Sequence, residues 1–264
     1  MSKKFYKLAD KVVFLVNRLI SKKLQKYRDE DLIHSINEYP FSFISQPQTG
    51  SNNIGIRTET SDFDVFKQIF ISKEYQSVVD LFNKYNYTPS LMIDAGANVG
   101  YSSLYLSAFF PDINIIALEP FEGNYHQLAL NTKGINAQAI KAALWSSDDD
   151  LKISHDFRDG KEWSKTVTQA SKKENEILVK AVSLGSILRD HTISSIDFFK
   201  IDIEGAEEEV IFSESFQQNI DIIKVIAVEI HDEVCSRQRI CDFFSQKGFK
   251  WFNSGELVIA HKLN

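Results

Sequence analysis

The segment from Leu91 to Gly100 constrains the fold more than any other part of the chain. It reads Leu-Met-Ile-Asp-Ala-Gly-Ala-Asn-Val-Gly, an apolar run that ends in an acid and two glycines, and the residues after it have a helical pattern. This is the sequence of a strand, a tight turn and a helix start. Glycines let such a turn approach a bound molecule closely, and the first N–H groups of the helix can point at that molecule. The segment therefore predicts a nucleotide-like ligand.

A second apolar run, Asn114 to Leu118, ends at Glu119, which lies 23 residues after Gly96. In nucleotide-binding βαβ units an acid at about this position accepts hydrogen bonds from ribose hydroxyls, so we expect Glu119 to bind a ribose. The glycines are spaced Gly96-x-x-x-Gly100, and the extra glycine that makes room for a pyrophosphate in G-x-G-x-x-G turns is missing. The turn thus favours a nucleoside without a diphosphate.

From Leu91 onward, apolar strands alternate with helical segments, which predicts a doubly wound, mostly parallel sheet with helices on both faces. The expected strands are Leu91–Asp94, Ile113–Glu119, Ala137–Leu144, Asp197–Ile201 and Ile223–Ile230, followed by a C-terminal antiparallel hairpin of Lys250–Asn253 and Leu257–His261. Ligands of such sheets bind beyond the carboxyl ends of the strands. Asp94, Glu119, Leu144, Asp202 and the Glu229-Ile-His231 segment fall at those ends, so they are candidates for a site.

Four motifs in this order resemble the FkbM family of S-adenosylmethionine-dependent methyltransferases. They are Asp94-Ala-Gly-Ala-Asn98-Val-Gly100, then Glu119-Pro120 with Asn124 and Asn131, then Lys200-Ile-Asp202-Ile-Glu204-Gly205-Ala206-Glu207, and then Glu229-Ile-His231. The likeness runs from about Asp62 to the C-terminus. Glu122 departs from the pattern, because many relatives carry proline after the Glu-Pro pair. The resemblance implies a Rossmann-like class I methyltransferase fold with seven strands.

The resemblance also implies S-adenosylmethionine as the cofactor and a hydroxyl of a glycan, a lipid-linked sugar or a natural product as the methyl acceptor. Asp94 is expected to orient the glycine turn and meet the methionine amino group, with capping of the next helix as the alternative. Asn98 holds either the turn or the cofactor carboxylate, and Asn124 either contacts the cofactor or caps a helix. The expected cofactor site comprises Asp94, Gly96, Asn98, Gly100, Glu119, Asn124 and Leu144.

A hydroxyl acceptor must lose a proton during the reaction. The candidates to take it are Asp202 and Glu204 after the fourth strand and Glu229 and His231 after the fifth. Histidine has the ordinary pKa nearest neutrality, so His231 is the first choice and Asp202 the second. Asp202, Glu229 and His231 could instead hold a divalent ion, but we expect no metal. For Lys200 we expect a strand-end side chain with its ammonium in solvent.

The first 28 residues differ from the rest of the chain in charge. Nine lysines and arginines are opposed there only by Asp10, and apolar residues recur every three or four positions, which predicts a basic amphipathic helix. Such a helix can bind an anionic membrane surface. The alternative is that it packs on the protein itself, either on its own domain or on the second subunit of a homodimer. A connector rich in turn formers follows, with short strands at Phe41–Ile44 and Ile54–Arg57. We therefore expect an N-terminal extension over residues 1–60 and a methyltransferase domain over 61–264.

Composition narrows the class of protein. The net charge of −6 gives no support for a nucleic acid partner, because phosphate binding needs a basic surface. The spacing of Cys235 and Cys241 suits neither a metal pair nor a disulfide scaffold, which favours a reduced, cytoplasmic setting. The polar stretch from His155 to Glu176 predicts a substrate lid, with Trp163 as either a sugar-stacking platform or an anchor.

Two other functions remain open at this point. A non-catalytic protein that binds S-adenosylmethionine as a regulatory ligand would show the same binding motifs. An NAD-dependent oxidoreductase shares the strand, the turn and the ribose acid, but this chain lacks the G-x-G-x-x-G turn and a well-placed Tyr-x-x-x-Lys pair.

Overall fold

The computed structural model describes residues 42–44, 53–57, 60–154, 166–169 and 178–264. The expected basic helix of residues 1–28 lies outside the described residues, as does Trp163 with most of the expected lid. Among the described helices, none is both long and apolar enough to cross a membrane.

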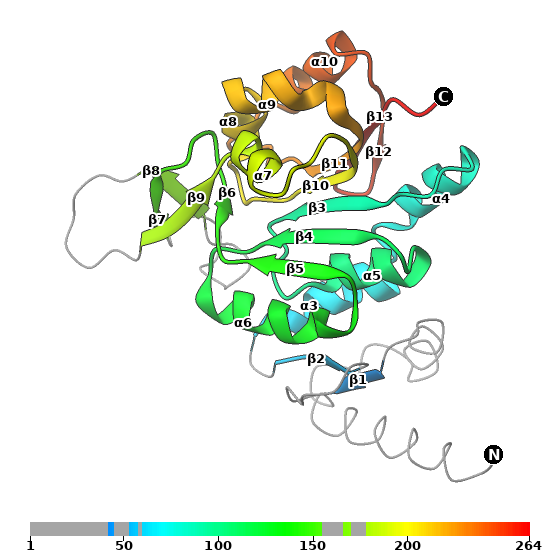
Figure 1. Ribbon diagram of the computed structural model, residues 1–264, viewed down its shortest axis with the longest axis vertical. Helices are drawn as coiled ribbons and strands as arrows, with labels where there is room; N and C mark the ends of the chain where they lie inside the picture. Colours follow the sequence, from blue (N-terminus) through cyan, green and yellow to red (C-terminus); the bar gives the residue numbers. More distant parts are fainter. Residues whose placement is uncertain (1–41, 45–52, 58–59, 155–165, 170–177) are drawn as a thin grey trace.

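A seven-stranded sheet forms the centre of the molecule, in the order β12-β13-β11-β10-β3-β4-β5 (Figure 1). The strands are β3 (Leu91–Ala95), β4 (Asn114–Leu118), β5 (Ala137–Ile140), β10 (Ile196–Ile201), β11 (Ile223–Glu229), β12 (Lys250–Ser254) and β13 (Leu257–His261). All neighbouring strands are parallel except β13, which pairs antiparallel with both β11 and β12. This topology confirms the predicted mostly parallel sheet with a C-terminal hairpin.

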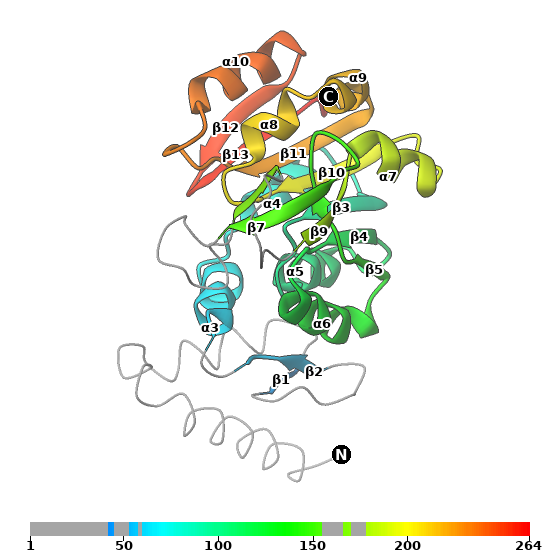
Figure 2. The same ribbon diagram turned by 90° about the vertical axis from the view of Figure 1, so that its left-hand side faces the viewer.

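Helices cover both faces of this sheet (Figure 2). One face carries α3 (Asp62–Phe66), the π-helix η2 (Lys67–Ile71), α4 (Gln76–Lys84), α5 (Tyr101–Phe109) and α6 (Glu122–Asn131). The other carries α7 (Leu184–Asp190), α8 (Glu207–Ile211), α9 (Glu214–Asn219) and α10 (Arg237–Gln246). Short 3₁₀ turns follow α6 at Thr132–Gly134 and α9 at Ile220–Ile222.

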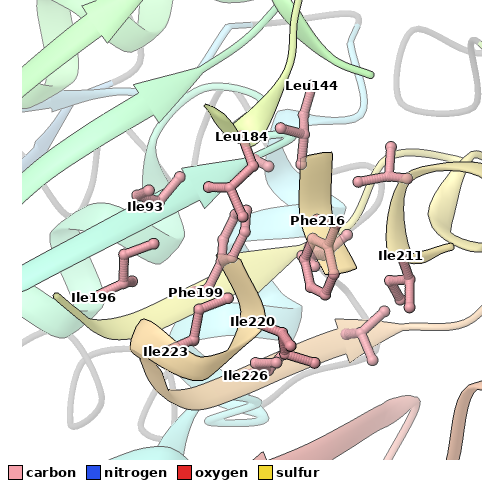
Figure 3. Packing of buried hydrophobic residues seen from close by; sticks show 14 of the residues in the cluster. Ile93, Leu144, Leu184, Ile196, Phe199, Ile211, Phe216, Ile220, Ile223 and Ile226 are labelled. Atoms are coloured by element: carbon pink, nitrogen blue, oxygen red, sulfur yellow. The ribbon is translucent and has the colours of Figure 1, made fainter. Parts of the chain in front are cut away.

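The central strands are buried on both sides because successive side chains of a strand point to opposite faces. Met92 and Phe198 belong to the apolar cluster under α4 and α5. Their neighbours Ile93 and Phe199 belong to the second cluster, where Phe199 stacks on Phe216 of α9 (Figure 3). This pattern explains why the sequence of these strands is almost continuously apolar instead of alternating.

The expected strand from Ala137 to Leu144 is wrong in its extent. The strand β5 ends at Ile140, where an Ala142 N–H donates to the Ile140 carbonyl at 3.0 Å and closes a tight turn. The chain then enters a second sheet of order β6-β9-β7-β8, made of β6 (Ala143–Leu144), β7 (Asp150–Ser154), β8 (Thr166–Gln169) and β9 (Leu178–Val182). The apolar run hides this break because both parts are partly buried.

Two short parallel strands, β1 (Ser42–Ile44) and β2 (Asn53–Gly55), precede the domain. The backbone N–H of Gly55 donates to Asn131 Oδ1 of α6 at 2.8 Å, and Tyr101 donates its hydroxyl to the Gly55 carbonyl. Ile54 and Ile56 are buried in the core cluster. The end of the expected connector is therefore part of the domain's packing.

The chain visits β3, β4 and β5 in one direction and then returns to β10 and β11 on the other side of β3. The order of strands thus reverses between β3 and β10. In open α/β sheets, ligands bind at the carboxyl ends of the strands at such a reversal. The expected glycine turn after β3 and the Lys200 to Glu207 motif after β10 lie on either side of it.

Candidate functional site

A cavity of about 340 Å³ lies at this reversal point, beyond the carboxyl ends of β3, β4, β10 and β11. One part, which we call the glycine half, is lined by Gly96, Ala97, Asn98, Glu119, Phe121, Asn124, Leu144 and Trp145. A second group of lining residues, which we call the acidic half, comprises Gln68, Glu74, Tyr75, Asp202, Glu229 and Glu256. A volume in this range suits a small organic ligand.

The glycine turn owes its shape to three residues with left-handed backbone angles. The φ angles are +74° at Gly96, +51° at Asn98 and +87° at Gly100. A Cβ atom on Gly96 would lie 1.7 Å from the carbonyl oxygen of Asp202, far inside any allowed contact. Glycine is required at this position because two backbones meet there.

The N–H groups of this turn are largely used within the protein. Those of Gly96 and Ala97 both donate to the Leu118 carbonyl, at 3.1 and 2.9 Å. The Asn98 N–H donates to Glu119 Oε2 at 2.9 Å, and the Gly100 N–H donates to the Ala97 carbonyl. These four N–H groups of the turn are therefore not available to a ligand. A diphosphate would find few donors here, whereas a ligand that carries its own donors finds acceptors.

Glu119 is the buried acid of the glycine half. Its Oε2 accepts the Asn98 N–H and its Oε1 accepts the Phe121 N–H at 3.0 Å. Burial raises the pKa of Glu119 to about 8, despite these two hydrogen bonds and the nearby Lys200 charge. Each carboxylate oxygen has a second lone pair, so Glu119 can still accept hydrogen bonds from a ligand.

Asp94 and Lys200 form a buried ion pair behind the turn. Lys200 Nζ lies 3.2 Å from Asp94 Oδ1, 3.5 Å from Asp202 Oδ2 and 2.7 Å from the Gly96 carbonyl oxygen. The expectation of a solvated lysine is wrong, because only 3% of this side chain is exposed. Burial acts to lower the pKa of Lys200, but Asp94 and Asp202 raise it well above its ordinary value. Lys200 is therefore a fixed positive charge.

Asp94 supports the glycine turn, as expected, but it does not reach the cavity. It is fully buried and does not line the cavity. Its Oδ2 accepts hydrogen bonds from the hydroxyls of Ser102 and Ser103 in the first turn of α5, at 2.6 and 2.7 Å. Together with Lys200, these bonds orient the glycine turn from behind. Gly100 also lies off the cavity wall, where a Cβ would meet Leu128.

The acidic half brings four carboxyl groups together, from Glu74, Asp202, Glu229 and Glu256. Repulsion from Asp202, followed by burial, raises the pKa of Glu229 to about 9. Burial raises the pKa of Glu74 to about 7. Glu256, from the turn between β12 and β13, completes the set. Lys200 is the one cation that borders the cavity among the described residues.

His231 lies beside this half, not on the cavity wall. Its Nδ1 is 2.9 Å from Glu207 Oε1, and its Nε2 is 3.3 Å from Glu204 Oε2 and 3.9 Å from Glu229 Oε1. Burial alone would lower the pKa of His231, but the hydrogen bonds to Glu204 and Glu207 raise it to about 11. The imidazole is thus protonated near neutral pH and has no free lone pair. This geometry does not fit the general base that we expected at His231.

The structure brings most of the expected cofactor and catalytic residues onto one cavity wall. They are Gly96, Asn98, Glu119, Asn124, Leu144, Asp202 and Glu204. Asn124 does not cap α6, whose N-cap residue is Phe121, and its Oδ1 accepts a hydrogen bond from Arg57 at 2.8 Å. Trp145 lines the cavity and also packs on the small cluster around Leu151.

Sequence reasoning missed three groups that shape the site. Glu207 is fully buried and accepts hydrogen bonds from the Ile203 and Gly205 N–H groups as well as from His231. Glu74 and Glu256 reach the cavity from segments that are distant in sequence, and no local pattern marks them. The burial of Lys200 did leave a signal, because a lysine inside a central parallel strand can be buried only if it is paired.

The comparisons with known proteins agree with this geometry. Residues 94–251 match the model of the Methyltransferase FkbM domain. The chain is 27% identical over 219 residues to Methyltransferase sdnD of Sordaria araneosa, covering 70% of this chain and 81% of that protein. It is 24% identical over 205 residues to Methyltransferase 1 of Beauveria bassiana, covering 70% and 80%.

Among solved structures, one match is the precorrin-6y C5,15-methyltransferase of Geobacter metallireducens. It shares 16% identity and a TM-score of 0.39, over 71% of this chain and 88% of that one. The family match covers the glycine turn, Glu119, the Lys200 to Glu207 motif and His231 together. The chain belongs to the FkbM family of S-adenosylmethionine-dependent methyltransferases.

Proposed function

We propose that this protein transfers a methyl group from S-adenosylmethionine to a hydroxyl group of an uncharged acceptor, a glycan, a lipid-linked sugar or a hydroxylated natural product. One observation carries the proposal. A single cavity joins a glycine half, with a buried acid for a ribose, to an acidic half, with carboxylates that can accept a proton. The cofactor belongs in the first half and the acceptor in the second.

The residues of the glycine half fit this cofactor. It offers acceptor oxygens, those of the Glu119 carboxyl group above all, whereas the turn N–H groups are used internally. Ribose hydroxyls and a methionine ammonium are donors that match such a wall. Leu144, Phe121 and Trp145 add apolar surface for an adenine. When bound, S-adenosylmethionine supplies an electrophilic methyl group.

We assign the role of general base to Asp202. Its carboxylate lies on the cavity wall at the end of β10, is 26% exposed, and has the Lys200 ammonium as its counter-ion. Glu229 is protonated at neutral pH because its pKa is raised to about 9, and His231 is protonated as well. Asp202 is thus the group best placed to take the proton of an acceptor hydroxyl. Glu204 borders the same space and is held by His231.

The charge of the acidic half supports an uncharged acceptor. Phosphorylated or carboxylated acceptors would be repelled by the carboxylates of this half, Asp202 and Glu256 among them, with only the paired Lys200 to offset them. A neutral sugar hydroxyl can instead donate hydrogen bonds to these carboxylates. Asn98, Glu119 and the other residues of the glycine half would not take part in this selection.

We propose that the reaction needs no metal ion. Ligand atoms of Asp202, Glu204 and His231 lie within 4.8 Å of one another, and those of Glu74, Glu229 and Glu256 form a second group. In the first group the His231 imidazolium already balances the carboxylate charge, because its pKa is raised to about 11. A chelator such as EDTA should leave turnover unchanged. Loss of turnover that added Mg²⁺ restores would reverse this assignment.

A labelling assay tests the proposal. Purified protein is incubated with S-adenosylmethionine carrying an isotopic methyl group and a panel of neutral sugars, a lipid-linked sugar and hydroxylated polyketides. The expected product is a methyl ether, which survives alkali, whereas a methyl ester does not. Asp202→Asn should lower turnover by about 10²- to 10⁴-fold. The control is Asp221→Asn, a solvent-exposed acid paired with Lys262.

The panel also separates the alternative functions. Cofactor binding without label transfer to any acceptor would favour a non-catalytic, regulatory binding protein. Label on an amine or a carbon atom would show a methyltransferase of a different acceptor class. Preferred labelling of phosphorylated sugars would contradict the role assigned to the acidic half.

A further inference from the structure

The three charged groups behind the glycine turn form a compact unit. Asp94 and Lys200 are opposite each other in the register of β3 and β10, and Asp202 follows two residues later. The Lys200 ammonium lies within 3.5 Å of both carboxylates. The Asp94 and Lys200 side chains are almost entirely buried, so solvent screens this unit poorly. In their ionised forms the three groups carry a formal charge of −1.

Lys200 also connects this charge to the backbone of the cofactor turn. Its Nζ donates to the Gly96 carbonyl at 2.7 Å. The same glycine packs so closely on Asp202 that a Cβ on Gly96 would lie 1.7 Å from the Asp202 carbonyl oxygen. The Asp202 N–H in turn donates to the Ala95 carbonyl at 3.1 Å. The turn and the β10 end are therefore held together by one ammonium and one backbone bond. A loss of the Lys200 charge would therefore affect two parts of the cavity wall, Gly96 of the turn and Asp202 after β10.

We propose that Lys200 is a positioning residue that fixes the glycine turn and limits the charge of the Asp94–Lys200–Asp202 triad to −1, and that this remaining charge favours cationic S-adenosylmethionine over its neutral product S-adenosylhomocysteine. The sulfonium makes the cofactor one charge unit more positive than the product. A wall with a net charge of −1 favours the cofactor, and the Lys200 ammonium limits how strongly it does so. The neutral product gains no such attraction, so it binds more weakly than the cofactor.

The inference concerns the cofactor of the family and does not depend on the proposed hydroxyl acceptor. Its test uses binding alone, without any acceptor. A failed acceptor screen would therefore leave this inference standing, and a failed binding test would leave the proposed acceptor class standing.

The experiment compares the dissociation constants of S-adenosylmethionine and S-adenosylhomocysteine in a set of variants. Both constants are measured by calorimetry at one pH and at a temperature well below the thermal transition of each variant. Lys200→Met removes the charge but keeps the length of the side chain. It should shift the ratio of the two constants by at least about tenfold in favour of S-adenosylmethionine, as expected for a unit charge within about 12 Å at an effective dielectric constant of about 20. Lys200→Arg keeps the charge and should keep the ratio.

Asp202→Asn changes the triad charge in the opposite direction and should shift the ratio against S-adenosylmethionine. Lys224→Met is the matched control, because Lys224 of β11 pairs with Asp197 at the opposite end of β10. It should lower stability without changing the ratio. Equal loss of both ligands in Lys200→Met would show a merely structural lysine and overturn the proposal. If Lys200→Met does not fold, an unchanged ratio in Asp202→Asn overturns it.

Discussion

The Nδ1 atom of His231 lies 2.9 Å from the Oε1 atom of Glu207, and both side chains are almost completely buried. The same carboxylate oxygen accepts the N–H groups of Ile203 and Gly205. Glu204, between them, has a left-handed φ of +55°. The ion pair thus fixes a strained loop that lines the cavity.

Removing the cation of this pair should be costly. We expect His231→Gln to lower the free energy of unfolding by about 3 kcal/mol, because it leaves buried carboxylates without their counter-ion. Chemical denaturation at pH 7 measures the difference. His126→Gln is the control, since His126 pairs with Glu122 on an exposed helix surface. It should change stability by less than about 0.5 kcal/mol. Similar losses in both variants would contradict the role of the buried pair.

Gly96→Ala should disrupt the site through the backbone. The new Cβ would lie 1.7 Å from the Asp202 carbonyl oxygen, and neither backbone can move without breaking the turn. Gly248→Ala is a close control, because Gly248 has a similar φ of +82° but nothing within 4 Å of its Cβ. We expect about 1 kcal/mol of destabilisation in the control and at least about 3 kcal/mol in Gly96→Ala, with loss of S-adenosylhomocysteine binding. Retained binding in Gly96→Ala would show that the turn does not border the cofactor.

Glu119→Gln tests the assigned ribose acid. The amide keeps the shape of the side chain but replaces one carboxyl oxygen, an acceptor for ribose hydroxyls, with an NH₂ donor, so we expect S-adenosylhomocysteine to bind about 10- to 100-fold more weakly. Glu122→Gln changes an exposed acid three residues along the chain, outside the cavity wall, and should leave the affinity unchanged. Calorimetric titration of both variants gives the comparison. Equal affinities for the two variants would remove Glu119 from the site.

Glu119 should also make the ligand-free protein less stable as the pH rises. Its pKa is about 8 in the folded protein against an ordinary value of 4.5, so the folded state keeps a proton that the unfolded chain has lost. Its stabilising contribution is complete below pH 4.5 and is lost as the pH rises through 8, with a slope of at most about 1.4 kcal/mol per pH unit. Denaturation at pH 5 to 9 should show a shallower decline for Glu119→Gln. Parallel curves for the two proteins would contradict the raised pKa.

Much of the fold could be predicted from sequence because its signals are local. The apolar run of β3, the glycines after it and Glu119 at the end of β4 lie within 29 residues, and their spacing marks a βαβ unit. The hairpin around Gly255 and the order of strands follow from similar patterns. The break between β5 and β6 could not be predicted, because it depends on the second sheet that β6 joins.

The chemistry of the site was harder to predict because it depends on which charges meet across the sheet. His231 has an ordinary pKa near neutrality in isolation, which suggested a base. Its actual protonation is set by Glu204 and Glu207, which local spacing does not place beside it. Lys200 likewise becomes a buried ion through Asp94, more than a hundred residues away in sequence. Residues that act through partners on other strands are thus the ones that sequence patterns describe least well.

The central claim is that the cavity between β3 and β10 is an S-adenosylmethionine site. The most direct test is a calorimetric titration of the purified protein with S-adenosylhomocysteine, with NAD as the parallel titrant and Glu119→Gln as the variant. We predict saturable, one-to-one binding of S-adenosylhomocysteine that is strongly weakened in the variant, and no binding of NAD. Binding of NAD alone, or binding of S-adenosylhomocysteine that is unaffected in Glu119→Gln, would contradict the account.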